Sequence, residues 1–544
     1  MKVKLFFIII FIFYSFGYSQ KINKELSNAL NQIDSIELKA HVLFLADDLL
    51  QGRKSGSFGE KIATQYIARQ FQSYGLKPGI ENGKSYFQEM TLVGVEMNND
   101  MVLKAYTKDK SIDFNFYTEF IGFSGIREKE IKIQDADVIF VGYGIEAPEY
   151  EWNDYKNIDM KGKVLLIINN DPSKDPKLFE GKKRLYYGRW DYKFDKAAKK
   201  GALGAIIIHT DESAGYGWQV IQSSWVGEQF DLKDNKSPKV KLQGWLTKEA
   251  SQKFVSLGGF NLDDLFNKAE SRDFYPINLG IKISIEMKSS IREVNTRNVI
   301  GILEGSDKEL KEEAVVYTSH FDHLGIGKAI NNDSIYNGAL DNATGISSLI
   351  TMAKAFNSLK VKPKRSIIFI ATAGEEEGLL GSDYFVQNPT YPLDKIIACI
   401  NIDAVNIFGE PKNIEIIGGE HSNLFKIVDE EARKLNMYGV MDQNLEQGSF
   451  YRSDQFNFAK VGIPSIYISN GEDFVGKPKG WGSKIMEKWS EKNYHQPSDE
   501  VEPWWDFKGM SKNVKVFFLT GYRLANEKSK PQWKFTSEFS KMRN

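Results

Sequence analysis

Cysteine is almost absent from this chain of 544 residues, in which Cys399 is the only one. A single thiol excludes an intrachain disulfide, and its place in the apolar run from Lys395 to Ile400 is typical of a buried core residue. A bound metal would therefore need oxygen and nitrogen ligands. Only six histidines are available to supply that nitrogen.

Excess charge of either sign is also absent. The 71 lysine and arginine residues and the 72 acidic residues leave a net charge of −1. Bulk electrostatics therefore gives no reason to expect nucleic acid or an anionic membrane as a partner. A charge-balanced surface agrees better with a small-molecule or peptide substrate.

The longest apolar run lies at the N-terminus. Lys2 and Lys4 precede an apolar stretch over residues 5–16, and the small residues Gly17 and Ser19 come just before Gln20. This pattern predicts a signal peptide over residues 1–19 and a secreted or periplasmic protein. An uncleaved anchor is the alternative, but the apolar core is short for a membrane span and no cysteine follows it for lipid attachment.

The length of the chain predicts two or more domains. Apolar spacing indicates two helices between Asp34 and Leu76, separated by turn residues at 51–57. From about Thr91 to Met287, short β-like runs alternate with turn clusters, which indicates a separate β-rich module. His209 is its one candidate ligand, and a lone histidine is more often structural.

Strands and helices alternate after residue 295. Apolar runs predict strands at 298–303, 314–319, 365–371 and 395–402, and a helix at 345–356. This order implies a mostly parallel mixed sheet flanked by helices, in which ligands bind at the carboxyl ends of the strands.

Polar residues follow several of these strands. Two histidines with three carboxylates suit zinc or manganese, and one carboxylate can bridge two cations about 3.5–4 Å apart. Each motif alone has an ordinary explanation, because Glu375 to Glu377 could start a solvated helix and Asp341 could cap one. The candidate residues are His320, Asp322, Asp341, Glu375, Glu376, Asp403 and His495.

With these candidate residues the chain resembles the secreted co-catalytic dizinc aminopeptidases, a family that includes relatives of glutamate carboxypeptidase and the transferrin receptor. The β-rich middle is similar to the protease-associated domain that many members carry as an insert. The resemblance implies residues 20–92 and 291–530 as the two parts of the peptidase domain, 93–290 as the insert and 531–544 as a tail. The matching segments are 319–325, 337–345, 373–382, 401–403 and 494–499.

The resemblance also implies roles for individual residues. Asp341 would bridge two zinc ions, one held by His320 and Asp403 and the other by Glu376 and His495. Glu375 would be the general base, Asp322 would orient His320, and Tyr494 would donate to the developing oxyanion. A cis peptide is expected between Asp341 and Asn342. His323 is expected to face away from His320 and not to be a ligand.

These roles predict an aminopeptidase that removes N-terminal residues from peptides with a free amine. Three alternatives stay open: a carboxypeptidase, a glutaminyl cyclase, or a non-catalytic receptor-type protein. An acid-specific carboxypeptidase should gather arginines at its pocket, and Arg452 is the only one near the motifs. Gln455 stands where many relatives have a histidine, which leaves substrate preference open.

Overall fold

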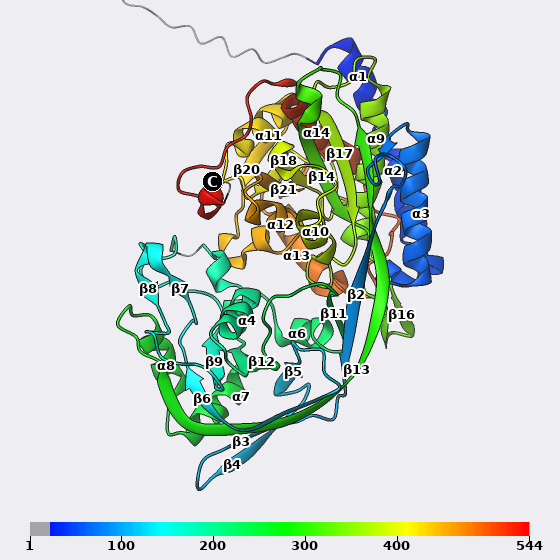
Figure 1. Ribbon diagram of the computed structural model, residues 1–544. Coiled ribbons are helices and arrows are strands. Elements are labelled where there is room, and N and C mark those ends of the chain that lie inside the picture. Colours follow the sequence, from blue (N-terminus) through cyan, green and yellow to red (C-terminus); the bar gives the residue numbers. More distant parts are fainter. Residues whose placement is uncertain (1–21, 182, 543–544) are drawn as a thin grey trace, which may run out of the picture.

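The computed structural model describes residues 22–181 and 183–542 (Figure 1). The predicted signal peptide lies outside these residues. The chain forms two halves, each built on its own group of paired strands (Figure 1). Across the described ranges, no helix combines the length and apolarity that a bilayer span requires.

The larger half contains a mixed sheet with a parallel centre. Strand β14 pairs in parallel with β17 on one side and with β18 on the other, and β18 pairs in parallel with β21. At the edges, β13 is antiparallel to β17 and β19 is antiparallel to β21, while β20 is parallel to β19. The strands are β13 (Ile277–Leu303), β14 (Ala314–His320), β17 (Ser366–Thr372), β18 (Ile396–Asn401), β19 (Asn413–Ile417), β20 (Tyr438–Met441) and β21 (Ser465–Asn470).

Helices cover both faces of this sheet, as expected for side chains that alternate along a buried strand. Val315 and Tyr317 of β14 pack with α9 and α14, whereas Val316 packs with Phe385 of α10 and Phe458 of α12. Two further helices, α2 and α3, contact α9 from outside. The helices are α2 (Ser35–Leu45), α3 (Phe58–Ser73), α9 (Thr344–Ser358), α10 (Leu380–Gln387), α11 (Leu424–Arg433), α12 (Gln455–Lys460), α13 (Trp481–Asn493) and α14 (Phe507–Asn526).

The smaller half is built on a second sheet. Strands β6, β9, β10 and β12 are parallel neighbours, and β5 and the first part of β13 pair antiparallel at the two sides. The elements are β3 (Val102–Tyr106), β4 (Ser111–Asn115), β5 (Phe120–Phe123), β6 (Glu130–Phe140), β9 (Val164–Ile168), β10 (Gly204–Ile208), β12 (Leu242–Leu246), α4 (Trp190–Lys199), α6 (Trp218–Ser224), α7 (Lys248–Leu257) and α8 (Leu262–Ala269).

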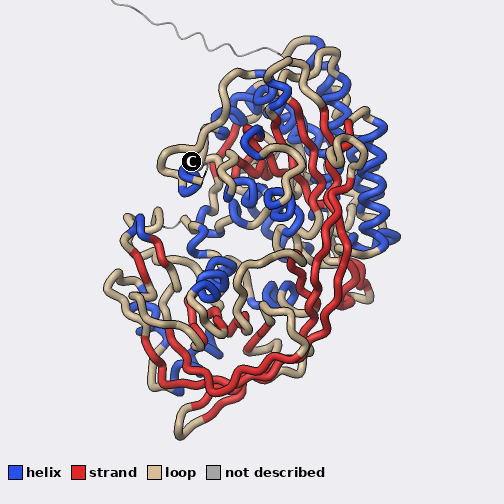
Figure 2. Tube along the Cα trace, viewed as in Figure 1, coloured by secondary structure: helices blue, strands red, loops and turns tan. Residues whose placement is uncertain are grey.

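A two-stranded ribbon joins the halves. Strand β2 (Phe87–Met97) pairs antiparallel with residues 289–299 of β13, and β11 (Glu228–Leu232) adds a third strand beside β2. Figure 2 shows β13 continuing from one sheet into the other. The domain boundaries expected near residues 92 and 290 fall inside these two strands, and the division into domains stays a prediction.

Most expected elements of the larger half are present within one or two residues of their predicted ends. One strand of the larger half differs in length. The strand expected at 298–303 is the end of the 27-residue β13. In the smaller half, β6 ends at Phe140, because Gly142 and Gly144 take left-handed φ angles of 57° and 62°.

Candidate metal centre and substrate cleft

Three neighbouring strands bring the predicted residues to one edge of the larger sheet. In the parallel register, His320 of β14 lies opposite Thr372 of β17, and Thr318 lies opposite Asn401 of β18. The segments that follow β17 and β18 therefore begin beside His320. They carry Glu375, Glu376 and Asp403, so the convergence expected at the carboxyl edge is present.

One cluster forms around His320, which is buried. Its Nε2 atom lies 3.2 Å from Oδ1 of Asp341 and 3.3 Å from Oδ1 of Asp403. Ser453 donates a hydrogen bond of 2.7 Å to the other oxygen of Asp403. Burial alone would lower the pKa of His320, but the negative charges of Asp403 and Glu375 raise it well above the ordinary value.

A second cluster forms around His495, which follows α13. Its Nε2 atom lies 3.4 Å from Oδ2 of Asp341 and 3.1 Å from Oε2 of Glu376. Asp341 therefore directs one carboxylate oxygen to each histidine. The structure thus brings all five predicted ligands together in two groups that share Asp341.

The backbone at Asp341 is held firmly from several sides. The peptide bond between Asp341 and Asn342 is cis, as expected. The Asn342 side chain donates to the carbonyl of Ile402 at 3.1 Å and accepts the N–H of Gly345 at 2.9 Å. Asn342 thus takes the capping role at the start of α9 and leaves the Asp341 carboxylate facing the two histidines.

Asp499 and Arg53 support this backbone, and sequence reasoning assigned neither of them a role. Buried Asp499 accepts the N–H groups of Leu340 at 2.9 Å and Asp341 at 3.1 Å. Arg53 is 1% exposed and donates to the carbonyls of Asn337 at 2.7 Å and Gly338 at 2.9 Å. The turn residues around Arg53 do not indicate in the sequence that its side chain reaches the carbonyls of Asn337 and Gly338.

Asp322 contacts the site differently from the expected way. Its carboxylate lies 3.9 Å from Nδ1 of His320, and that nitrogen is 3.2 Å from the Asp322 backbone carbonyl instead. The carboxylate oxygens accept the backbone N–H groups of Glu375 at 3.2 Å and Glu376 at 3.3 Å. Asp322 therefore positions the loop that carries both glutamates.

His323 does not face away from the site, contrary to the expectation. Its Nδ1 atom lies 2.7 Å from Oε1 of Glu376, and its ring packs edge-on against His495 with centroids 5.6 Å apart. The strand alternation used to place it stops at His320, where β14 ends. His323 is buried and contacts a predicted ligand.

Burial acts on the pKa of both Glu375 and Tyr494. Burial raises the pKa of Glu375 well above its ordinary value, and the neighbouring Asp403 and Glu376 add to this rise against the opposing charge of His320. Burial also raises the pKa of Tyr494, whose ring stacks on His495 with centroids 3.9 Å apart. Tyr494 therefore keeps its hydroxyl proton and can donate it in a hydrogen bond.

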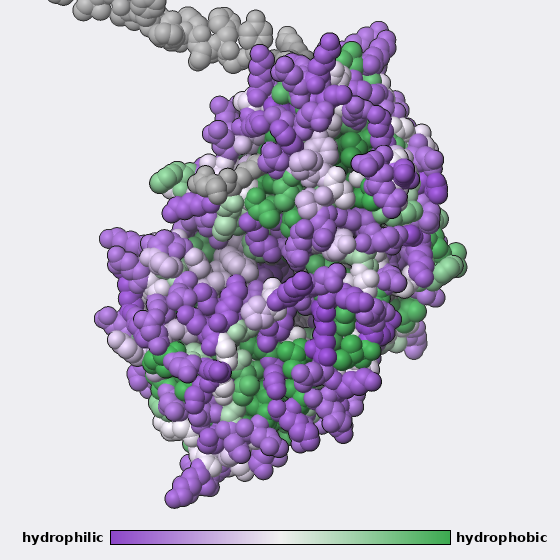
Figure 3. Space-filling view, in the orientation of Figure 1, coloured by the Kyte–Doolittle hydropathy of each residue, from purple (hydrophilic) through white to green (hydrophobic). Residues whose placement is uncertain are grey.

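These residues open into a large cleft between the two halves of the molecule. Its volume is about 680 Å³, and Figure 3 shows the surface hollowed between the halves. The smaller half lines this cleft with Arg184, Arg189, Trp190 and Tyr216, which sequence reasoning missed because they lie far from every motif. Arg452, the only arginine near the sequence motifs, is thus joined in the cleft by arginines of the smaller half.

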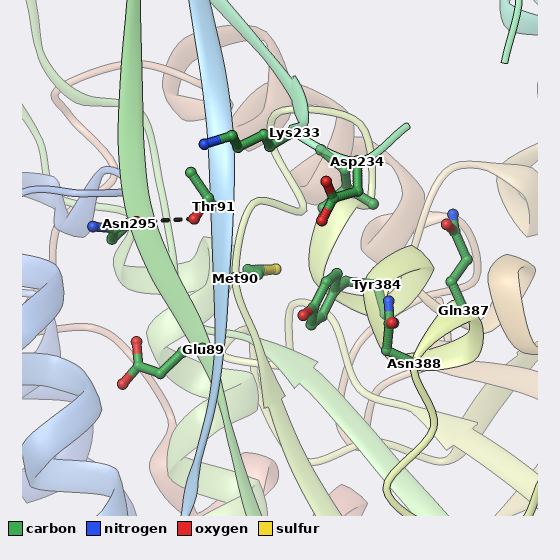
Figure 4. Close-up of a pocket in the computed structure, with 10 residues that line it drawn as sticks. Glu89, Met90, Thr91, Lys233, Asp234, Asn295, Tyr384, Gln387 and Asn388 are labelled. Carbon is green, nitrogen blue, oxygen red and sulfur yellow. Dashed lines mark hydrogen bonds between the residues drawn. The ribbon is translucent and has the colours of Figure 1, made fainter. Parts of the chain in front are cut away.

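A second cavity of about 380 Å³ lies beside β2 and α10 (Figure 4). On one side of it Thr91 of β2 donates a hydrogen bond of 3.0 Å to Asn295 of β13, and Tyr384 and Asn388 face it from the other side. None of the predicted site residues lines this cavity. His209 also lies away from the site and packs against Trp218 and Trp245 within the smaller half.

The donor set fits divalent zinc. Asp341, Glu376 and Asp403 are carboxylates brought together with two imidazoles, and a buried group of like charges needs cations close to it. Nitrogen and oxygen donors of this kind suit zinc. Two groups of possible ligands share Asp341. One adds His320 and Asp403, and the other adds Glu376 and His323, with His495 also beside Asp341 and Glu376.

Residues 298–517 match the model of peptidase family M28. A glutamate carboxypeptidase 2 homolog from Caenorhabditis elegans is 25% identical over 392 residues, which cover 62% of this chain and 46% of that protein. Aminopeptidase YwaD from Bacillus subtilis (strain 168) is 29% identical over 212 residues, which cover 38% of this chain and 40% of that protein. The chain thus spans less than half the length of these relatives.

The fold has a counterpart among solved structures. The aminopeptidase from Aneurinibacillus sp. strain AM-1 superposes with a TM-score of 0.52 at 18% identity, over 92% of this chain and 96% of that one. At this identity the likeness supports the fold of both halves and says nothing of the substrate.

Proposed function

We propose, on the premise that residues 298–517 are a domain of peptidase family M28, that this chain is a zinc-dependent aminopeptidase acting on peptides with a free N-terminus. The observation that carries the proposal is the position of Asp341. Its two carboxylate oxygens face two different histidines, each with a carboxylate of its own beside it. This is the arrangement that a pair of metal ions sharing one ligand requires.

His320 and Asp403 would hold one zinc ion, Glu376 and His495 would hold the other, and Asp341 would bind both. Two such ions supply Lewis acidity, which polarises a carbonyl group and makes water acidic enough to lose a proton near neutral pH.

The chain's own residues would move the protons. Glu375 takes a proton from the attacking water and passes it to the leaving amine, a task suited to a carboxyl group whose pKa is raised toward the working pH. The Tyr494 hydroxyl donates a hydrogen bond to the oxygen on which negative charge develops. Asp322 keeps Glu375 in place through its backbone N–H.

The proposal is tested by hydrolysis of aminoacyl-anilides with purified protein. We expect activity that a chelator abolishes and that added zinc restores. Glu375→Gln should lower kcat by about 10²–10⁴-fold while the protein still binds zinc, since proton transfer by a positioned side chain contributes about that factor. Near-wild-type turnover by Glu375→Gln, or activity that survives the chelator, would refute the mechanism.

One observation favours a second candidate, a carboxypeptidase. Such an enzyme should gather arginines at its pocket, and the smaller half adds Arg184 and Arg189 to Arg452 in the cleft. N-acetylated peptides separate the two candidates, because an aminopeptidase requires the free amine. Cleavage of an acetylated dipeptide at a rate similar to the free dipeptide would favour the carboxypeptidase.

The smaller half and the N-terminus complete the proposal. We take residues 93–290 as a protease-associated-like insert and residues 1–19 as a signal peptide, so the enzyme would act outside the cytoplasm. Mass spectrometry of the protein recovered from its native host tests the second point. A mature chain that begins at Gln20 is expected.

A further inference from the structure

We propose that Arg452 and Arg184, brought together across the cleft by the two halves, bind a carboxylate of a short peptide substrate. The inference rests on the proposed peptidase function and names the substrate class of that site. The carboxylate is either the C-terminus of the peptide or an acidic side chain beyond the scissile bond. Substrates with this group would be peptides short enough to place it within the cleft.

Arg452 carries a charge without a partner of opposite sign. Its guanidinium lies over the ring of Tyr216, 5.8 Å from the centroid, and makes no hydrogen bond or ion pair with the residues that the structure describes. Arg189, which lines the same cleft, differs because its Nε atom lies 3.3 Å from Asp191. The guanidinium of Arg452 is therefore available for a carboxylate, which it can bind through two parallel hydrogen bonds.

Arg184 supplies a second positive charge close by. It is 6% exposed, and its donors reach only uncharged oxygens, with Nε 3.3 Å from Asn170 and Nη1 3.2 Å from the carbonyl of Ala214. Burial, together with the positive charge of Arg452, lowers the pKa of Arg184 to about 10 against the opposing charge of Asp171. Two neighbouring cations with no carboxylate in contact form a site that an anion would stabilise.

The contacts between the halves fix these two arginines relative to each other. The backbone N–H of Arg184 donates to the carbonyl of Leu445 at 3.0 Å. Gly448, at φ 62°, lies against the Arg184 side chain, where an added Cβ would come within 3.0 Å of Cδ. The turn that accepts hydrogen bonds from Arg184 leads directly to Tyr216, which lies beneath Arg452. The site exists only because both halves contribute to it.

The site also lies within reach of the metal centre. Arg452 precedes Ser453, whose hydroxyl donates to Asp403 at 2.7 Å, and Arg452, Tyr494 and His495 line one cleft. A peptide bound with its reacting carbonyl at the metal centre would thus extend toward the arginines.

The test compares four peptides that share the N-terminal residue best cleaved as an anilide. Two differ only at the C-terminus, as X-Ala and X-Ala-amide, and two differ only in side-chain charge, as X-Glu-amide and X-Gln-amide. We expect wild-type kcat/KM to favour the carboxylate member of at least one pair by about 10–100-fold, the worth of a charged hydrogen bond. The pair that shows the preference identifies the source of the carboxylate.

Replacing the arginine should remove this preference. In Arg452→Gln the ratio should fall to about one through KM, and Arg452→Lys should keep an intermediate ratio because the charge remains without the planar fork. Lys460→Gln is the matched control, since Lys460 lines the same cleft but lies over Phe456, 5.0 Å from the ring centroid. Lys460→Gln should keep the wild-type kcat/KM ratio. This result would exclude a general loss of positive charge in the cleft as the cause of the change in Arg452→Gln.

The proposal is overturned if both wild-type ratios lie within about twofold of one, or if Arg452→Gln keeps the wild-type preference. Anilide hydrolysis by the wild-type enzyme separates these results from a failure of the peptidase proposal. If the anilide is cleaved and the ratios are flat, only the carboxylate site is wrong. Equal melting temperatures of Arg452→Gln and wild type would show that the change in ratio does not come from misfolding.

Discussion

The carboxylate of Asp499 accepts the backbone N–H of Asp341 at 3.1 Å, so the proposed bridging ligand is held by a residue 158 positions later in the chain. The same carboxylate accepts the N–H of Leu340. Burial raises the pKa of Asp499 to about 6, although both of these hydrogen bonds oppose the rise. The N–H groups of Leu340 and Asp341 thus help to keep Asp499 ionised, although it is buried beside the carboxylate of Asp341.

Replacing Asp499 should weaken metal binding without removing a ligand. We expect Asp499→Asn to lower zinc affinity by about 10–100-fold, the usual cost of losing a partner that orients a ligand. Competition with a chelator of known affinity measures this change. Ser498→Ala is the control, because Ser498 donates to the carbonyl of Lys492 and not to the site. Unchanged affinity in Asp499→Asn would show that Asp341 keeps its position without the charge of Asp499.

Asp341→Ala should lose both metal ions, because each proposed ion depends on one of its oxygens. The metal content of the purified variant, measured by mass spectrometry of the digested protein, should fall from about two per chain to near zero. Asp403→Ala provides the comparison, since it should lose one ion and keep the other. A content near two in Asp341→Ala would contradict the bridging role.

His323 should act by positioning Glu376. Its Nδ1 atom lies 2.7 Å from Oε1 of that residue. We expect His323→Ala to raise the zinc concentration needed for half-maximal activity by about tenfold or more, while kcat at saturating zinc changes much less. His323→Asn should recover part of the affinity, because an amide nitrogen can replace Nδ1 as a donor. Equal losses in both variants would indicate that His323 is itself a ligand.

Glu60 should make stability depend on pH. It accepts hydrogen bonds from Thr296 and from the N–H of Gly56, and burial raises its pKa to about 7 although both bonds oppose the rise. The unfolded chain ionises near 4.5, so the stabilising contribution of Glu60 is complete below pH 4.5 and is lost as the pH rises through about 7. Through this group the free energy of unfolding changes by about 3 kcal/mol at most.

Gln at position 60 cannot ionise, so the stability of Glu60→Gln should depend on pH differently from that of the wild type. The difference in melting temperature between the two should move in favour of Glu60→Gln between pH 4.5 and pH 8. Glu151→Gln, at an exposed position, controls for the change in net charge. A difference that stays constant with pH would show that Glu60 is ionised throughout, stabilised by its hydrogen bonds.

The metal centre could be predicted because its residues follow buried strands. The apolar runs before His320, Glu375 and Asp403 specify parallel strands, and parallel strands place the residues after them at one edge. Asp341 was harder, since its motif is also that of a helix cap. The structure separates the two functions between neighbours, with Asn342 accepting the N–H of Gly345 at the helix start.

The rest of the site depends on contacts that no local pattern encodes. His323 was misplaced because strand alternation was extended three residues beyond the end of β14. Arg184 could not be linked to Arg452 from sequence, because they lie 268 positions apart and only the packing of the two halves joins them. The length of β13 was missed for a related reason, since one strand crosses two differently patterned sheets.

The paired crossing of β2 and β13 also determines how the two halves can move. A hydrogen-bonded ribbon resists shear and in-plane bending, because either would break the ladder between residues 87–97 and 289–299, but it flexes easily perpendicular to its face. The ribbon therefore allows the halves to bend about one axis and does not let them rotate freely. Opening of the cleft should follow a single direction, so Arg184 would return to the same place opposite Arg452 after each substrate enters.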